Sequence, residues 1–373
     1  MTSTIEHLQT TLEPRISPWI TGKDNINLVI GAVQGEQHQI AAWGTLQSSG
    51  KAVDETTLFE IGSLTKLFTT TLLAILVEQG QLTLEMPVNQ LGTAYEKLPD
   101  TITLESLATH TSGLPRLPSN LVKSLRENPH NPYKAYTVQD LEEYLQTWDN
   151  QPGKTTGIIS YSNLGVGLLG HILTEVLGQS YEDAIAQYIC NPLSLSDTCI
   201  TLNPEQQQRF AQGYNEGGKP VQPWDLPTLA GAGALRSTAT DLLTFMAAHW
   251  HSPSSALLNT RELRYQEFAP NSGLFGIVEK LGKWVQKWRG KPLVQPETRG
   301  IGLGWIIEYL PECDGVVYAH TGGTAGHRAF CGFIPETQTG VVVLSNYGDD
   351  FASMFGRYAI DKVGLKVIEM LSI

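Results

Sequence analysis

Residues 57–69, TLFEIGSLTKLFT, carry Ser63 three positions ahead of Lys66, where an apolar helix is predicted to begin. Residues i and i+3 share one helix face, so we expect the Lys66 amine to approach the Ser63 hydroxyl. A serine hydroxyl becomes a nucleophile when a neighbouring base takes its proton, and a buried lysine with a lowered pKa is such a base. The free N–H groups at a helix N-terminus also suit a developing oxyanion.

This S-x-x-K spacing has a plainer explanation when it stands alone. Ser63 would then be only a helix N-cap, and Lys66 a solvated lysine of the first turn. The apolar neighbours Leu64, Leu67 and Phe68 make a solvated lysine less suitable here. Further motifs are needed to decide between a nucleophile and a cap.

The second motif is Tyr161-Ser162-Asn163, immediately before a helix predicted over residues 164–177. A phenol close to a lysine is stabilised as a phenolate, and it can then move a proton from the serine to a leaving group. Asn163 offers both a donor and an acceptor, either for a substrate amide or for orienting the lysine. By itself this triplet would be an ordinary helix entry.

The third motif is HTGGT at residues 320–324, where a strand predicted over residues 315–320 ends in a glycine-rich turn. Small residues would let a substrate backbone lie alongside the strand, and the Gly323 N–H would serve as an oxyanion donor. In isolation this motif would be a glycine hairpin.

The amino-acid composition excludes several classes of protein and of binding partner. Hydrophobic residues make up 41% of the 373 residues and charged residues 17%, which predicts a large core and argues against disorder. There are 25 Lys and Arg against 37 Asp and Glu, a net charge of −12. Nucleic acids and anionic membranes need a basic surface, so neither is expected as a partner. We expect a small-molecule or peptide substrate and a monomer or small homo-oligomer.

Several sequence features bear on the compartment. Residues 1–17 lack the basic and apolar regions of a signal peptide, which predicts a cytoplasmic protein, or a periplasmic one if a leader was removed. The most apolar run, Leu67–Val77, is about half as long as a bilayer requires and is predicted to be a buried helix. The four cysteines have no metal-ligand spacing and are expected to be reduced, with a Cys190–Cys199 bridge as the alternative.

The predicted elements run from strands and a helix, through a block of helices, to strands and a final helix. The expected helices cover residues 3–13, 64–79, 164–177 and 352–371, with further starts at Thr137, Ser180 and Thr238, and the expected strands cover 26–33, 37–44, 301–310, 315–320, 327–334 and 339–345. Residues 203–235 are expected to be a long loop. Terminal segments of this kind can share one antiparallel sheet.

With S-x-x-K, Y-x-N and H-T-G in this order, about 100 and then about 160 residues apart, the chain resembles the serine β-lactamase and penicillin-binding protein superfamily. The Y-x-N element is similar to that of the class C β-lactamase branch, which includes D-Ala-D-Ala carboxypeptidase/endopeptidases and esterases. The segments LATHTSGLP (107–115), WDLPTLAGAGALRST (224–238) and GVVVLSN (340–346) also match that branch. The resemblance covers residues from about 25 to 350.

The resemblance implies an α/β (α+β) fold, an antiparallel sheet flanked by helices with an inserted all-helical lobe. The expected domains are residues 1–80 with 230–373 for the sheet and 81–229 for the helices, with the active site in the cleft between them. The resemblance implies that Ser63 is the nucleophile, Lys66 its base and Tyr161 a proton relay. It implies an oxyanion hole formed by the N–H groups of Ser63 and Gly323. The residues implied in substrate binding are Asn163, His320, Thr321 and Gly322. No metal or cofactor is expected.

His320 departs from the lysine usual in the family's K-T-G element. An imidazole is charged only part of the time near neutral pH, which weakens recognition of a substrate carboxylate. Arg328 would restore a fixed charge near the site, or it is an exposed strand arginine. H-T-G is the form found in many peptidase- and esterase-like relatives.

The predicted function is a serine hydrolase that forms an acyl-enzyme on Ser63 and cleaves an ester or amide. The alternatives are a class C β-lactamase, a D-Ala-D-Ala carboxypeptidase, an acyltransferase, or a penicillin-binding sensor without turnover.

Two further patterns are not interpreted as binding sites. Residues 165–170 match the dinucleotide-binding pattern G-x-G-x-x-G but are expected to be helix-packing glycines. The pair His249 and His251 lacks a third metal ligand.

Overall fold

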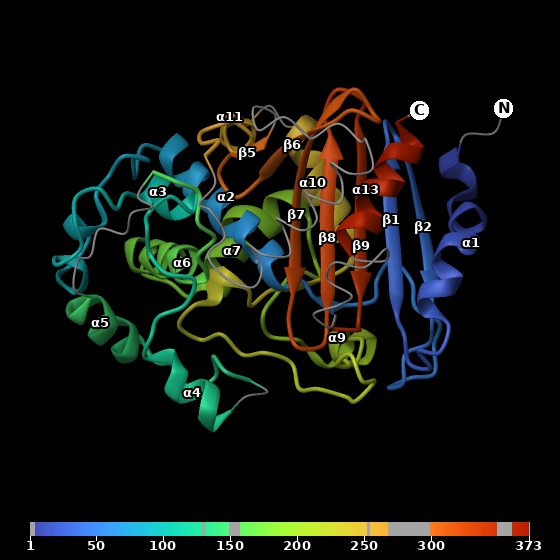
Figure 1. Ribbon diagram of the computed structural model, residues 1–373, viewed down its shortest axis with the longest axis horizontal. Helices are drawn as coiled ribbons and strands as arrows, with labels where there is room; N and C mark the ends of the chain where they lie inside the picture. The colour runs from blue at the N-terminus through green and yellow to red at the C-terminus, as the bar shows by residue number, and fades with distance from the viewer. Residues whose placement is uncertain are drawn as a thin grey trace, which may run out of the picture.

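The computed structural model describes residues 4–128, 131–148, 157–251, 254–267, 299–348 and 360–372. Seven strands form its main sheet: β1 (Leu28–Gln34), β2 (Gln37–Trp43), β5 (Arg299–Ile301), β6 (Ile306–Leu310), β7 (Gly315–Gly323), β8 (Arg328–Ile334) and β9 (Thr339–Ser345). All neighbours are antiparallel, in the order β2-β1-β9-β8-β7-β6-β5 (Figure 1).

Strands from the two ends of the chain are neighbours in this sheet. Strand β1 lies between β2 and β9, with Leu28 opposite Ser345 and Gln34 opposite Thr339. The strands predicted over residues 26–33 and 37–44 are thus neighbours, and the predicted sharing of one sheet by both terminal segments is confirmed.

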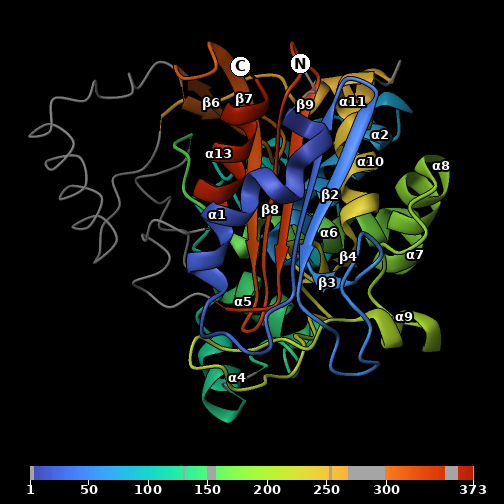
Figure 2. The ribbon, with the colours of Figure 1, turned by 90° about the vertical axis from the view of Figure 1, so that its right-hand side faces the viewer.

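Helices cover both faces of the sheet (Figure 2). Helices α1 (Leu8–Ile20) and α13 (Ile360–Leu371) pack on one face, while α2 (Thr65–Glu78) and α10 (Ala239–His251) lie on the other. Successive strand side chains point to opposite faces, so Leu28 and Ile30 enter the core beneath α1 while Val29 enters the core beneath α10. This double coverage explains why β1 is buried along almost its whole length.

A block of helices follows α2 in the chain, and most of it lies to the left of the sheet in Figure 1. It contains α3 (Leu104–Ala108), α4 (Leu121–Glu127), α5 (Val138–Thr147), α6 (Asn163–Leu177), α7 (Tyr181–Ile185), α8 (Asn191–Leu193) and α9 (Pro204–Arg209). The two-residue strands β3 (Phe59–Glu60) and β4 (Arg236–Ser237) pair with each other at the entrance and exit of this segment. The expected fold class, an antiparallel sheet flanked by helices, is confirmed.

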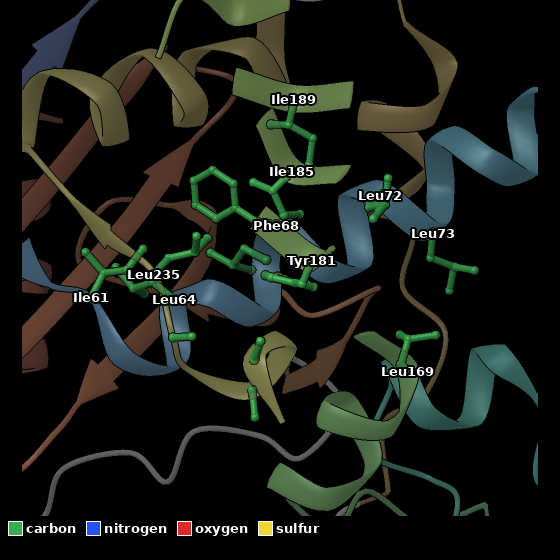
Figure 3. Close-up of a cluster of buried hydrophobic side chains, with 14 of the residues drawn as sticks. Ile61, Leu64, Phe68, Leu72, Leu73, Leu169, Tyr181, Ile185, Ile189 and Leu235 are labelled. Carbon is green, nitrogen blue, oxygen red and sulfur yellow. The ribbon is translucent and has the colours of Figure 1, made fainter. Parts of the chain in front are cut away.

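Helix α2 runs through the larger of two cores. Leu64, Phe68 and Leu72 pack with Ile185 and with other residues of the helical block (Figure 3). This core reaches without interruption from the inner face of the sheet to α5 and α6. The apolar run Leu67–Val77 is thus a core element, and within the described ranges no helix is long and apolar enough to cross a membrane.

Local signals place several helix ends correctly. Gly80 follows α2 with φ +72°, and Gly178 follows α6 with φ +65°, both in the left-handed conformation that stops a helix. Thr137 begins α5 with both hydrogen bonds of a capping box.

Residues 165–170 lie inside α6, where a Cβ at Gly170 would be 2.9 Å from the Gly231 Cα, so these glycines serve helix packing. All four cysteines are free thiols, without the Cys190–Cys199 bridge.

Other predictions for the secondary structure were wrong in extent. The helix expected over residues 3–13 is a 3₁₀ turn followed by α1, which continues to Ile20 through Pro14 and Pro18 because Ile16 and Trp19 extend its apolar face. The expected loop 203–235 contains α9, which begins with an Asn203 capping box.

The predicted strands also differ in length. The strand expected over residues 301–310 is the pair β5 and β6, because a turn with Gly304 at φ +82° separates them. The strand expected to end at His320 continues to Gly323, so the HTG motif is part of β7 and not of a turn. Of the final helix expected over residues 352–371, the first eight lie outside the described residues, and α13 covers the rest.

The packing of α2 yields a stability prediction. The Phe68 ring stacks on Phe245 with centroids 4.0 Å apart, and both side chains are fully buried. Phe68→Ala should lower the free energy of unfolding by about 3–5 kcal/mol, because it leaves a cavity in a close-packed core. Val122→Ala, at a side chain 46% exposed, should change it by less than about 0.5 kcal/mol. Urea titration measures both, and equal values would contradict the central packing role of α2.

Candidate active site

Ser63 lies in a 3₁₀ turn, Gly62–Leu64, directly before α2. The turn is pressed against β7: a Cβ on Gly322 would be 1.9 Å from the Ile61 carbonyl oxygen, and a Cβ on Gly62 would be 2.6 Å from the Gly323 nitrogen. Gly62 also has φ +49°, a conformation that favours glycine. The two glycines thus let the backbone of β7 approach the residue that carries the candidate nucleophile.

Lys66 follows one turn later on α2 and is fully buried. Its Nζ lies 3.0 Å from Ser63 Oγ and 2.7 Å from the Ala232 carbonyl oxygen. Burial, together with the charge of Arg116, holds the pKa of Lys66 well below its usual value. The neutral amine, which is able to accept a proton from the serine, is favoured by this environment.

Tyr161 lies next to both groups. The Lys66 Nζ is 5.0 Å from the centre of its ring, and the guanidinium carbon of Arg116 is 5.1 Å from the same point. Burial raises the pKa of Tyr161 to about 12, although a hydrogen bond with Ser63 and the charge of Arg116 act in the opposite direction. Burial therefore favours the protonated phenol of Tyr161, whereas it favours the neutral amine of Lys66.

Two histidines flank Tyr161, and one of them, His320, was predicted to bind substrate. The ring of His320 lies 6.2 Å from that of Tyr161, and the ring of His110 lies 4.5 Å from it. Burial and the charge of Lys66 lower the pKa of His320 to about 4, so the imidazole is neutral at physiological pH. His110 is buried too, and its Nδ1 accepts the Ser162 N–H at 3.2 Å.

Asn163 is the first residue of α6, and its backbone N–H donates to the Arg116 carbonyl oxygen at 3.0 Å. Its side-chain Oδ1 is buried, and no hydrogen-bond donor in the described part of the chain satisfies it. The side chain borders a small cavity that Ser63 and Gly323 also line. A buried acceptor without a partner beside a nucleophile is suited to a substrate N–H.

These groups surround a pocket of about 460 Å³. Five residues of the three motifs line it: Ser63, Tyr161, Thr321, Gly322 and Gly323. His320 is not part of the lining, and only 5% of its surface is exposed. The remaining lining residues are Arg116, Trp224, Thr324, Arg328, Ile360 and Asp361.

The sequence motifs did not identify Arg116 or Trp224. Arg116 directly follows the segment LATHTSGLP, and Trp224 begins the segment 224–238, so the resemblance was a signal for both positions. Arg328 was left open between a pocket charge and an exposed strand residue, and it lines the pocket. A groove of about 510 Å³ between α1 and α13 is larger, but its lining holds no serine, cysteine or histidine among the described residues.

Comparisons with known proteins find relatives along most of the chain. The family model described as Beta-lactamase matches residues 23–364. The chain is 27% identical to a "Beta-lactamase" of Pseudomonas fluorescens over 91% of this chain and 93% of the relative. It is 26% identical to the "D-alanyl-D-alanine-carboxypeptidase/endopeptidase AmpH" of Escherichia coli (strain K12), over 87% and 80%. A class C beta lactamase structure from Rhodobacter sphaeroides matches with a TM-score of 0.71 and 26% identity, over 91% and 94%.

The buried amine predicts a pH-dependent stability. In the unfolded chain the Lys66 pKa is near 10.4, as in model peptides, whereas in the folded chain it is well below the usual value. The unfolded state therefore binds more protons between these two values, and the free energy of unfolding should rise with pH in that window by about 1 kcal/mol per pH unit. Lys66→Met should lack this slope. Urea titrations of both proteins between about pH 7 and pH 9 measure it, and parallel curves would contradict a depressed pKa.

Proposed function

The chain belongs to the beta-lactamase family, and on that premise we propose that Ser63 is the nucleophile with which it cleaves an ester or amide through an acyl-enzyme. It is a serine hydrolase of the β-lactamase type. The observation that carries the assignment of Ser63 is the 3.0 Å contact between its Oγ and the buried amine of Lys66. A hydroxyl next to a desolvated amine is the arrangement that activates a serine.

The acylation step follows from the positions of these groups. The neutral Lys66 amine takes the Ser63 proton while Ser63 Oγ bonds to the carbonyl carbon of the substrate. The carbonyl oxygen becomes an oxyanion, which the N–H groups of Ser63 and Gly323 stabilise. When the bond to the leaving group breaks, Tyr161 donates its proton to that group and regains one from the Lys66 ammonium.

Deacylation uses the same groups with water in place of the leaving group. The neutral Lys66 amine takes a proton from the water, with the Tyr161 hydroxyl as relay, while the water oxygen adds to the acyl carbon. The resulting oxyanion occupies the same site between Ser63 and Gly323. Collapse of this intermediate returns the proton to Ser63 Oγ and releases the carboxylic acid.

Substrate binding is proposed for the end of β7 and for Asn163. Strand β6 pairs with β7 only as far as Ala319, so among the described strands residues 320–323 have a neighbour on one side, β8. An extended substrate backbone is able to lie along this open side, near Thr321 and Gly322. The unpaired Asn163 Oδ1 would accept an amide N–H of the substrate.

For the substrate class, we propose a neutral ester or a short amide. His320 is neutral where the family usually has lysine, and the net charge of −12 gives an anion no long-range attraction. A second candidate is a carboxylate-bearing substrate, such as a β-lactam or a D-Ala peptide. It is supported by the side chains of Arg116 and Arg328 in the pocket lining and by the names of the relatives.

The domain division and the compartment are part of the proposal as well. We propose a sheet domain of residues 1–80 and 230–373 and a helical domain of residues 81–229. The pairing of β3, in the first part of the sheet domain, with β4, in its second part, supports this division. A cytoplasmic location is supported by the four free cysteines, because oxidising compartments favour disulfides. We propose a monomer or small homo-oligomer without cofactor.

The direct test is Ser63→Ala. A fluorophosphonate probe and fluorescent penicillin should label the native protein and fail to label the variant. Hydrolysis of p-nitrophenyl esters should fall by about 10³-fold or more, because removal of a nucleophile leaves only binding and oxyanion stabilisation. A panel of short esters, D-amino-acid amides and the cephalosporin nitrocefin then ranks the substrates.

Three outcomes of this test separate the alternatives. Equal labelling of the variant would contradict Ser63 as the nucleophile. Permanent labelling of the native protein without turnover of any substrate would identify a sensor. Transfer of the acyl group to an added amine or alcohol in preference to water would identify an acyltransferase.

His320→Lys should shift the preference between substrates. A lysine at this position adds a cation near the pocket, so the ratio of kcat/KM for nitrocefin to kcat/KM for a neutral ester should rise several-fold, about 1 kcal/mol. His38→Lys, which adds the same group to the exposed part of β2, is the matched control and should leave the ratio unchanged. An unchanged or lower ratio in His320→Lys would count against this role of position 320.

A further inference from the structure

We propose that a buried ion pair between Glu60 and His327 positions the two halves of the oxyanion hole. Glu60 lies in the stretch 57–69 but outside its S-x-x-K element, His327 belongs to none of the three motifs, and neither residue lines the pocket. Their side chains lie behind its wall, 4% and 0% exposed. The inference rests on the oxyanion roles proposed for Ser63 and Gly323.

The hydrogen bonds of His327 show that one ring nitrogen must carry a proton. Its Nε2 lies 3.0 Å from the Ala211 carbonyl oxygen, which only accepts, so Nε2 donates. Its Nδ1 lies 2.8 Å from Glu60 Oε2. The protonation of Nδ1 therefore depends on whether Glu60 is ionised.

The contacts of Glu60 are those of an ionised carboxylate. Its Oε1 accepts the Trp224 N–H at 2.7 Å, and its Oε2 accepts the Thr324 hydroxyl at 2.8 Å. The Thr324 oxygen already accepts the N–H groups of Gly326 and His327, so its own proton points to Glu60. Both carboxylate oxygens accept hydrogen bonds from other donors, which favours the carboxylate, and the 2.8 Å contact with Nδ1 is then a hydrogen bond that His327 donates.

The direction of the pKa shift of Glu60 agrees with an ionised carboxylate. Burial by itself would raise the pKa of Glu60, but the hydrogen bond and charge of His327, with the bonds from Thr324 and Trp224, hold it below its usual value. An ionised pair removed from water is retained when its geometry is good and the remaining lone pairs are satisfied. Here each carboxylate oxygen and each ring nitrogen has a partner.

This carboxylate joins three segments that form the site. Glu60 belongs to β3, three residues before Ser63. Thr324 follows Gly323 directly in the chain, and Trp224 lines the pocket from a third segment. The N–H groups of Ser63 and Gly323 must converge on one oxygen to stabilise an oxyanion. Loss of the pair would let the two segments that carry these groups move relative to each other, which would disturb that convergence.

The consequence is a positioning role that is specific for the transition state. The oxyanion exists in the tetrahedral intermediates and not in the bound ester, so a loosened hole should affect kcat more than KM. A misplacement of the order of 1 Å is enough to cost about 10²-fold in rate.

The test compares Glu60→Gln with the native protein. The amide keeps the shape but places an N–H group against donors, which releases at least one of the three segments. We expect kcat for a p-nitrophenyl ester to fall by about 10- to 100-fold and KM to change by less than about threefold. Affinity for a boronic acid, which mimics the tetrahedral intermediate, should fall by the same factor as kcat/KM. Thr324→Val, which removes one link only, should show the same pattern with a smaller loss.

Asp197→Asn is the matched control. Asp197 pairs with Arg209 at 2.7 Å, is itself partly buried, and touches none of the pocket residues in the hydrogen bonds described. The kcat of the Asp197→Asn variant and its affinity for the boronic acid should stay within about twofold of the native values, even where its Tm is lower. The inference is overturned if Glu60→Gln is no worse than this control, or if it raises KM and leaves kcat unchanged.

A spectroscopic measurement tests the ion pair without reference to activity. In a nitrogen NMR spectrum of the native protein at neutral pH, assigned with His327→Gln, both ring nitrogens of His327 should carry protons, and one should lose its proton in Glu60→Gln. A singly protonated ring in the native protein overturns the inference. Failure of the proposed function is distinct, because it would appear as unchanged hydrolysis in Ser63→Ala.

Discussion

The contact between the backbone of β7 and the turn that carries Ser63 is the constraint on which the site depends. A single added carbon at Gly322 would meet the Ile61 carbonyl oxygen at 1.9 Å. This contact brings a strand from the end of the chain against a helix from its beginning. The pairing of β1 with β9 makes that possible, because it holds both ends of the chain in one sheet. The oxyanion hole proposed here spans this contact.

Burial of Lys66 is the second constraint, and it links stability to chemistry. The core around α2 that removes water from its amine also disfavours the ammonium form, so the group best able to take a proton costs the fold some stability. Tyr161 experiences the same burial with the opposite result, because its neutral form is the protonated one. The same burial thus favours a deprotonated lysine and a protonated tyrosine, which are the two states that the proposed mechanism uses.

The sequence predicted those parts of the fold that depend on local geometry. The ends of α2 and α6 were correct because Gly80 and Gly178 adopt a backbone conformation that few other residues tolerate. The division of residues 301–310 into β5 and β6 was not predicted, since Gly304 gives no local sign of whether it bends the chain. The continuation of α1 past Pro14 was missed for a related reason: its apolar face is stabilised by packing on the sheet, which outweighs the local penalty.

For the site, the sequence by itself determined the candidate chemistry: Ser63 and Lys66 share a helix face because of their spacing, and Tyr161, Asn163 and the HTG motif were recognised by residue type and order. Tertiary structure decided what these groups are able to do. Neutral His320, the pocket arginines and the Glu60–His327 pair all depend on which distant segments remove water from a side chain or supply its hydrogen-bond partners. Charge and protonation depend on that three-dimensional environment, and residues more than 200 positions apart create it.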